Sequence, residues 1–270
     1  MFIVNLVKYL FLGLVQGFTE PIPVSSSGHL RIFKEILNDK IFNDLSLEIF
    51  LNFGSLIAIV IFFWKDIVEI INDFCKFIKS KEKRYKANFK YALMIAVGTL
   101  PAAIIGLLFN DAIEKVLGNI KFVGVALLVT AIFLYIIKDF KGKKDDEKIT
   151  YKDALIVGLF QAVALFPGIS RSGATLVGAM LLGIKRKSAF KFSFMLYIPI
   201  SLATMILGVK NFLSSNITVE IIAYYLIGMV AAFVMTLFAT KWFNKIINKG
   251  KLIYFVIYCI IIGTSVILFL

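Results

Sequence analysis

The sequence predicts an all-α polytopic membrane protein, with about six transmembrane helices and two re-entrant helical hairpins related as an inverted-topology repeat. Three observations lead to this prediction. First, 60% of the 270 residues are hydrophobic, against roughly 45–50% in a soluble domain, and the mean hydropathy is +0.89. Second, these residues are gathered in long apolar blocks. Third, two similar motifs occur far apart in the chain, beginning at Gly13 and Gly158.

Six apolar blocks are expected to cross the bilayer, because its hydrocarbon core requires about 20 residues of helix. They are Leu47–Trp64, Tyr91–Phe109, Phe122–Ile137, Met195–Val209, Ile221–Ala239 and Leu252–Leu270. No polar stretch between them is long enough for a soluble domain, so residues 1–270 are predicted to form one integral membrane domain. The first residues contain no basic region followed by a cleavage site, so no removable signal peptide is expected.

The net charge of +13 predicts an orientation in the membrane. Most of the lysines and arginines lie in four short loops, at residues 76–90, 138–152, 185–191 and 241–251. Loops of this kind face the cytoplasm by the positive-inside rule and contact lipid headgroups. We therefore expect a multi-pass membrane protein whose basic loops face the cytoplasm, with membrane lipids as partners and no nucleic acid.

The two similar motifs indicate an internal repeat. Residues 13–28 read GLVQGFTEPIPVSSSG and residues 158–173 read GLFQAVALFPGISRSG. The apolar segments before the breaks, Tyr9–Phe18 and Ala154–Phe166, are too short to span the bilayer. The expected topology gives the copies opposite orientations, so we predict re-entrant hairpins whose tips meet near the membrane middle. One repeat covers about residues 1–137 and the other about 150–270, joined by a cytoplasmic linker at 138–152.

The first tip carries an acid, a base and three hydroxyls. Pro21 and Pro23 disfavour helix, so Ser25–Ser27 are expected where a new helix begins. The unpaired N–H groups of such a helix start attract anions. His29, the only histidine in the chain, lies three residues after Ser26 and is expected on the same helix face. Gln16, Thr19 and Glu20 precede this stretch.

The second tip carries Ser170, Arg171, Ser172 and Thr175, again at an expected helix start. A charge near the bilayer centre costs at least about 2.5–3.5 kcal/mol. Arg171 and Glu20 are therefore expected to function or to pair with each other. A guanidinium, hydroxyls and helix ends bind phosphate oxygens, and a carboxylate can act as a base or hold a divalent cation.

Plainer interpretations exist for each feature. The serines are also suited to be helix N-caps, His29 to be a satisfied interfacial histidine, and Glu20 with Arg171 to be a structural ion pair. Cys75 and Cys259 are expected to be structural thiols, since they are too isolated for a disulfide framework or a zinc site. The gathering of all the polar groups on the two repeated tips favours a site for a phosphoryl group.

The two tips resemble the motifs of the undecaprenyl-diphosphate phosphatases, also called bacitracin-resistance proteins. Gln-Gly-Phe-Thr-Glu (16–20) and Val-Ser-Ser-Ser-Gly-His (24–29) are similar to their first motif, and Pro-Gly-Ile-Ser-Arg-Ser-Gly-Ala-Thr (167–175) to their second. The resemblance implies hydrolysis of undecaprenyl diphosphate to undecaprenyl phosphate and inorganic phosphate. It also implies recycling of this lipid carrier for peptidoglycan synthesis, bacitracin resistance and a divalent cation (Mg²⁺ or Ca²⁺). The expected location is the bacterial inner (cytoplasmic) membrane, with an active site that opens outward.

The resemblance further implies residue roles. Glu20 is expected to bind metal or to act as acid and base, and Ser26 to be the nucleophile or a phosphate ligand with His29 as the base beside it. Arg171 is expected to clamp the diphosphate. Further phosphate ligands are Ser25, Ser27, Ser170, Ser172 and Thr175, with Gln16 and Thr19 in support. Whether Ser26, His29 or water attacks is left open.

Two positions depart from the family pattern. Position 16 is Gln where some members carry a second Glu, which would remove one metal ligand if that Glu binds metal. Pro21 replaces a residue that is commonly aromatic, so the local bend is expected to differ.

Two other functions compete with the phosphatase. A transporter that flips undecaprenyl phosphate would equally suit an inverted repeat with a polar site at mid-membrane. A purely structural membrane subunit would not explain the charged residues at the tips. A lipid phosphatase of the acid-phosphatase type is excluded, because that mechanism needs a second histidine and this chain has one. The sequence leaves a homodimer open.

Overall fold

The computed structural model describes residues 2–37, 45–116, 119–166, 168–213 and 218–270. The described residues are almost entirely helical, and no named β-strand occurs among them. The predicted fold class, an all-α polytopic membrane protein, is confirmed.

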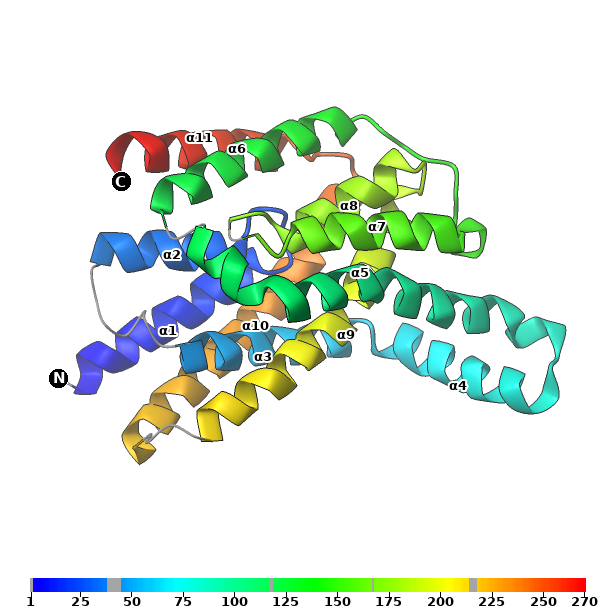
Figure 1. Cartoon of the computed structure of the whole chain (residues 1–270), viewed down its shortest axis with the longest axis horizontal. Coiled ribbons are helices and arrows are strands. Elements are labelled where there is room, and N and C mark those ends of the chain that lie inside the picture. Colours follow the sequence, from blue (N-terminus) through cyan, green and yellow to red (C-terminus); the bar gives the residue numbers. More distant parts are fainter. Residues whose placement is uncertain (1, 38–44, 117–118, 167, 214–217) are drawn as a thin grey trace.

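The helices follow one another with short connections (Figure 1). Before the basic linker lie α1 (Phe2–Thr19), α2 (Ser26–Leu37), α3 (Leu45–Phe62), α4 (Trp64–Ser80), the short 3₁₀ helix η2 (Lys83–Tyr85), α5 (Lys86–Val116) and α6 (Ile120–Ile137). The linker contains η3 (Asp146–Lys148). After it lie α7 (Tyr151–Val163), α8 (Arg171–Leu181), α9 (Arg186–Leu213), α10 (Val219–Asn248) and α11 (Ile253–Phe269).

The number of spans differs from the six predicted. Four helical stretches in the described residues are long and apolar enough to cross a membrane: Lys83–Phe109, Ile120–Ile137, Arg186–Gly208 and Val219–Asn248. A fifth is formed if α3 and α4 count as one span, although the chain bends by 73° between them. The predicted block Leu47–Trp64 therefore ends at a bend, and the predicted block Leu252–Leu270 becomes the shorter apolar helix α11.

Two short helices stand where the re-entrant segments were predicted, with different boundaries. α1 begins at Phe2 rather than at Tyr9, so it is longer than the predicted segment. α7 begins at Tyr151, because Thr150 and Asp153 form a capping box at its start. It ends at Val163, a few residues before the proline at position 167, which disfavours helix.

Each short helix packs closely on a long one, α1 on α10 and α7 on α5. Glycines make this approach possible. A Cβ atom on Gly13 would lie 2.2 Å from the carbonyl oxygen of Gly228, and one on Gly158 would lie 2.4 Å from that of Gly98. The packing of α1 on α10 thus resembles the packing of α7 on α5, as expected of two related halves. The inverted repeat itself, with its boundaries and linker, stays a prediction.

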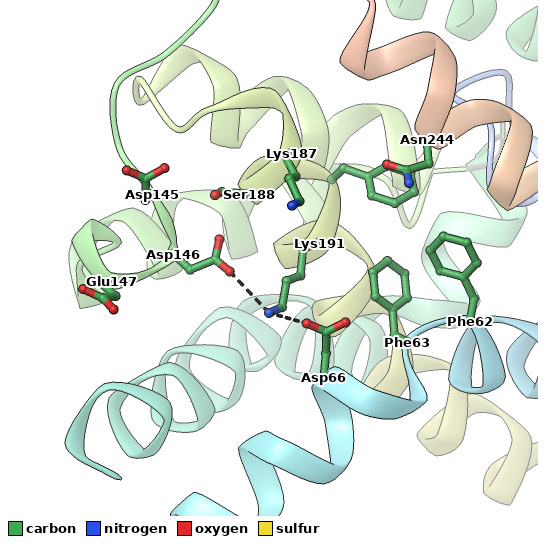
Figure 2. A pocket seen from close by; sticks show the side chains of 11 residues that line it. Phe62, Phe63, Asp66, Asp145, Asp146, Glu147, Lys187, Ser188, Lys191 and Asn244 are labelled. Carbon is green, nitrogen blue, oxygen red and sulfur yellow. Dashed lines mark ion pairs between the residues drawn. The ribbon is translucent and has the colours of Figure 1, made fainter. Parts of the chain in front are cut away.

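The basic loops meet at one end of the molecule. The linker joins the loop before α9, since Lys185 N–H donates to the Lys144 carbonyl (2.9 Å) and Arg186 Nη2 to the Lys138 carbonyl (2.8 Å). In Figure 1 the turn between α4 and α5 and the connection into α7 lie away from both chain ends. A cavity of about 670 Å³ lies near the linker, and in it Lys191 pairs with Asp66 (2.6 Å) and Asp146 (3.3 Å) (Figure 2).

Candidate active site

The backbone of the first tip is shaped by its prolines and its serines. α1 ends at Thr19, and α2 begins at Ser26 after a turn that contains Pro21 and Pro23. Ser25 adopts a positive φ of 66°, which reverses the chain direction. Its hydroxyl oxygen accepts the N–H of Gly28 (3.2 Å), so Ser25 caps α2.

The second tip repeats this local geometry. Ser170 is the N-cap of α8, and its hydroxyl accepts the N–H of Gly173 (3.1 Å). The hydroxyl oxygens of Ser170 and Ser172 lie 3.2 Å apart, as those of Ser25 and Ser27 lie 3.4 Å apart. The N-cap interpretation therefore holds for the first serine of each tip, and the N–H groups of two helix starts remain near the later serines.

The two tips lie in contact. Ser172 donates its hydroxyl to the Ile22 carbonyl of the first tip (3.1 Å). Arg171 Nη2 donates to Oε1 of Glu20 (3.2 Å), and Glu20 is 8% exposed. The expected pairing of the two intramembrane charges is thus present, and it bridges helices that are far apart in the sequence.

The other oxygen of Glu20 serves the first tip. Oε2 accepts the hydroxyl of Ser26 in a short hydrogen bond and the amide N–H of Gln16 (2.9 Å). Gln16 donates its second amide hydrogen to Oδ1 of Asn52 on α3 (2.9 Å). One oxygen of the Glu20 carboxylate therefore accepts a hydrogen bond from Ser26, the candidate nucleophile. The other oxygen pairs with the cationic side chain of Arg171.

Arg171 is held by α9 as well as by Glu20. Its Nη1 donates to the hydroxyl of Ser201 (3.0 Å), and its guanidinium lies 4.6 Å from the ring centre of Tyr197, a cation–π contact. Tyr197 and Ser201 are both buried. These contacts fix the plane of the guanidinium while part of it, 27% of the side chain, stays accessible.

A small polar pocket of about 80 Å³ lies between the tips. Eight of the predicted site residues line it: Gln16, Glu20, Ser25, Ser26, Ser27, Ser170, Arg171 and Ser172. Sequence reasoning missed Glu48 and Asn52 on α3, which also line it, and Tyr197 and Ser201 behind Arg171. Their position as polar residues inside the apolar blocks Leu47–Trp64 and Met195–Val209 is the signal that could have revealed them.

Three predicted residues, Thr19, Thr175 and His29, do not line the pocket, and the two threonines bond within their surroundings. Thr19 donates its hydroxyl back to the Val15 carbonyl (2.7 Å). Thr175 donates to the Arg171 carbonyl (2.9 Å) and forms a short hydrogen bond with Ser193 on α9. Both hydroxyls thus bond to helix carbonyls in this structure, and Thr175 does not line the pocket as the predicted phosphate ligand would.

The geometry of His29 differs from the prediction. Its Nδ1 lies 2.8 Å from the Ser25 carbonyl, which requires a donated hydrogen, so Nε2 accepts the hydroxyl of Tyr258 on α11 (2.6 Å). The imidazole is stacked on the Tyr258 ring. The expected placement of His29 as the base beside Ser26 is therefore not met, because the ring turns toward α11 and Glu20 occupies the place beside the Ser26 hydroxyl.

The pocket is suited to a hard cation shared with a substrate. Among the described residues no group of three or more His, Cys, Asp or Glu side chains is placed to hold a metal ion. The pocket does offer oxygens from two carboxylates, Glu20 and Glu48, and from Asn52 and the serines. Mg²⁺ is commonly held by one or two carboxylates together with substrate phosphates. The donor set therefore fits such a cation.

A pocket that gathers a guanidinium, serine hydroxyls and two helix N-termini among apolar helices is typical of a membrane protein that binds a phosphorylated ligand. The comparison with known families agrees with that class. Residues 9–265 match the family described as bacitracin resistance protein BacA, and the chain belongs to that family.

Curated relatives cover almost the whole chain. It is 43% identical over 265 residues to undecaprenyl-diphosphatase 2 of Bacillus thuringiensis (strain Al Hakam), with 98% of each chain covered. It is 45% identical over 268 residues to undecaprenyl-diphosphatase of Oceanobacillus iheyensis, covering 98% of this chain and 97% of the relative.

Proposed function

We propose that the protein hydrolyses undecaprenyl diphosphate to undecaprenyl phosphate and inorganic phosphate. The names of full-length relatives that are 43–45% identical support this activity. The observation that carries it in the structure is the continuous contact from the Ser26 hydroxyl through the Glu20 carboxylate to the Arg171 guanidinium. This arrangement joins a nucleophile, a base and an anion-binding cation in one pocket.

In the proposed reaction, Ser26 attacks the terminal phosphorus of the diphosphate. The Ser26 oxygen forms a bond to that phosphorus while the bond to the bridging oxygen breaks, and undecaprenyl phosphate leaves with the electron pair. Glu20 accepts the hydroxyl proton. Water then attacks the phosphorus of the phosphoserine, and the Ser26 oxygen leaves and takes back the proton held by Glu20. Inorganic phosphate departs with the water oxygen and one of its protons, and the second water proton passes to solvent.

Arg171 stabilises the charge that develops on the phosphoryl oxygens. Phosphoryl transfer depends mainly on positioning and on charge stabilisation. When Glu20 takes the proton it loses its negative charge, and its attraction for Arg171 weakens. The guanidinium is then available to the phosphoryl oxygens at the moment when negative charge develops on them. The free backbone N–H groups at the starts of α2 and α8 add further donors.

We further propose a divalent cation, Mg²⁺ or Ca²⁺, with Glu20 and Glu48 as its carboxylate ligands. A cation there would neutralise part of the diphosphate charge. Position 16 carries an amide, which binds a divalent cation less strongly than a carboxylate would. The affinity of the site for the cation therefore depends on the phosphates of the bound substrate.

The protein is proposed to lie in the bacterial inner membrane with the pocket open to the outside. Glu48, in the first turn of α3, lines the pocket. In Figure 1 the start of α3 lies at the end of the helix opposite the one that leads through α4 to the basic turn before α5. The basic loops face the cytoplasm by the positive-inside rule. In that orientation the enzyme returns the lipid carrier to peptidoglycan synthesis and confers bacitracin resistance.

The activity is tested with purified protein in detergent and undecaprenyl diphosphate. Ser26→Ala is expected to lower the rate of phosphate release by about 10³-fold or more, because it removes the nucleophile. Ser27→Ala is the matched comparison: it removes a hydroxyl that lines the same pocket and pairs with Ser25, so a much smaller loss than that of Ser26→Ala is expected. A Ser26→Ala enzyme that keeps a tenth of the activity would show that water attacks directly. No release by folded wild-type protein would favour the lipid-flipping function instead.

The cation is tested by chelation and by Gln16→Glu. EDTA is expected to abolish release, and Mg²⁺ or Ca²⁺ to restore it. Gln16→Glu adds a carboxylate beside Glu20, so we expect the cation concentration for half-maximal activity to fall about tenfold. Gln16→Ala is the control, because it removes the hydrogen bond to Glu20 without adding charge. Full activity in EDTA would contradict the proposed cation.

A further inference from the structure

A second, apolar cavity lies beside the polar pocket, between α6, α7 and α8. Its volume is about 130 Å³, and its accessible surface is entirely apolar. It is lined mainly by Val129 and Phe133 of α6, Phe160 and Val163 of α7, and Ala174 and Val177 of α8. Thr130 also lines it, but its hydroxyl donates to the Ala126 carbonyl (2.9 Å) and so offers the cavity only its methyl group. We call this cavity the α6–α8 groove.

The α6–α8 groove adjoins the proposed active site. Ile169 lines both the groove and the polar pocket, and it directly precedes Ser170 and Arg171. One side chain therefore separates the phosphate-binding groups from an apolar surface. A ligand whose phosphate lies against Arg171 would place the first carbons of its chain near Ile169.

The groove opens sideways from the helix bundle. Phe133 is 40% exposed and Val163 is 50% exposed. Exposed apolar side chains on membrane helices face lipid, so a hydrocarbon chain can enter the groove from the bilayer. An apolar cavity of roughly 150 Å³ stays dry and holds a benzene ring. The α6–α8 groove is thus large enough for about five carbon atoms, the size of one isoprenyl unit.

We propose that the α6–α8 groove binds the isoprenyl unit next to the diphosphate of the substrate. This proposal rests on the proposed function, and it adds a specificity determinant to it. The polar pocket recognises any diphosphate, whereas the groove distinguishes prenyl diphosphates from diphosphates with no chain. The adjacency through Ile169 favours the substrate's own chain over an acyl chain of a bilayer lipid.

The test compares ligands that differ only in their chain. The KM values for dimethylallyl, geranyl and farnesyl diphosphates are measured with purified wild-type protein and Ala174→Phe, which fills the groove. Because Ala174→Phe displaces the same first isoprenyl unit of all three substrates, we expect KM to rise about tenfold for each. This rise corresponds to losing part of the binding free energy gained by burying five carbon atoms. The inhibition constant of methyl diphosphate, which has no prenyl chain, is expected to stay within twofold.

Two further variants keep the result interpretable. Phe133→Ala removes a wall of the groove from its exposed side and is expected to raise the same KM values without affecting methyl diphosphate. Leu159→Phe adds a similar ring on the exposed face of α7, outside the groove, and should leave every constant unchanged.

Three outcomes would overturn the proposal: unchanged KM values, an equal weakening of methyl diphosphate, or an effect seen only when phospholipid is added. The last would assign the groove to a bilayer lipid. An inactive wild-type protein would instead refute the proposed function itself.

Discussion

The two hairpin tips share one backbone plan but carry different charges. In both, a serine caps a helix through the glycine three residues later, and a second serine lies within 3.4 Å of the first hydroxyl. Yet Glu20 corresponds in the aligned motifs to Leu165, and Ser26 corresponds to Arg171. The first tip therefore supplies the acid and the nucleophile, and the second supplies the cation.

The two aligned glutamines show the same divergence. Gln16 donates to Glu20 and to Asn52, so its amide is part of the polar pocket. Gln161 is 1% exposed, and neither its amide nitrogen nor its amide oxygen has a hydrogen-bond partner among the described residues. Among the described residues, the glutamine of the first tip is thus hydrogen-bonded and the aligned glutamine of the second is not. The comparison teaches that the same backbone geometry can provide a helix start suited to an anion at both tips. A few side-chain differences then decide which groups act on the substrate.

Arg171→Ser tests the comparison most strongly, because it makes the second tip Ser-Ser-Ser like the first. We expect phosphate release to fall by about 10³-fold or more, since the transition-state charge loses its guanidinium. Arg171→Lys keeps the charge without the planar fork, so an intermediate loss is expected. Size-exclusion chromatography and thermal unfolding in detergent check that each variant is folded. A serine variant with more than a tenth of wild-type activity would refute the role of Arg171.

Tyr197 sharpens the comparison, because its ring on α9 packs against the guanidinium of Arg171. Ser26, the aligned residue of the first tip, has no charge for such a contact. Tyr197→Leu removes the ring under the guanidinium, and we expect kcat to fall about tenfold with a smaller change in KM. Tyr197→Phe keeps the ring and is expected to restore kcat to within about threefold of wild type. If the Phe variant lost as much activity as the Leu variant, the hydroxyl rather than the ring would matter.

Asp153 has the smallest expected effect on activity, because it lies at the linker end of α7. Burial opposes its ionisation, but hydrogen bonds from Lys144 and Thr150 outweigh burial and hold the pKa of Asp153 below its ordinary value. Its charge therefore stabilises the fold above the ordinary Asp pKa, and this stabilisation is lost as pH falls through the lower folded-state pKa. Asp153→Asn should cost about 1 kcal/mol at pH 7, as for a lost helix cap.

Thermal unfolding as a function of pH measures this contribution. The difference between wild type and Asp153→Asn is expected to narrow below about pH 4, near the ordinary Asp pKa, with phosphate release unchanged at pH 7. Glu147→Gln, an exposed change in the same linker, serves as the control. A difference that is constant across pH would mean that the charge of Asp153 does not contribute.

Several features of the site could be predicted because they depend on local chain chemistry. Pro21 and Pro23 interrupt helix wherever they stand, and serines before a glycine favour a helix start. The prediction that Glu20 and Arg171 pair follows from the cost of an isolated charge in the membrane. The orientation of His29 could not be predicted in the same way, because helix spacing does not reveal that Tyr258, 229 residues later, donates its hydroxyl to Nε2 of the ring.

The sequence by itself determined the helical membrane class, the two tips and most of the groups that line the pocket. Hydrophobic composition and proline helix breaks act within a short segment, and the free-energy cost of a buried charge applies to any chain in a bilayer. These features can therefore be inferred without knowing any tertiary contact. Only the tertiary structure decided that Glu20 rather than His29 lies beside Ser26, that α3 and α9 supply Asn52, Ser201 and Tyr197, and that α3 and α4 bend apart. These features depend on which distant helices pack together, and hydrophobic patterning in a membrane specifies burial in lipid without specifying a packing partner.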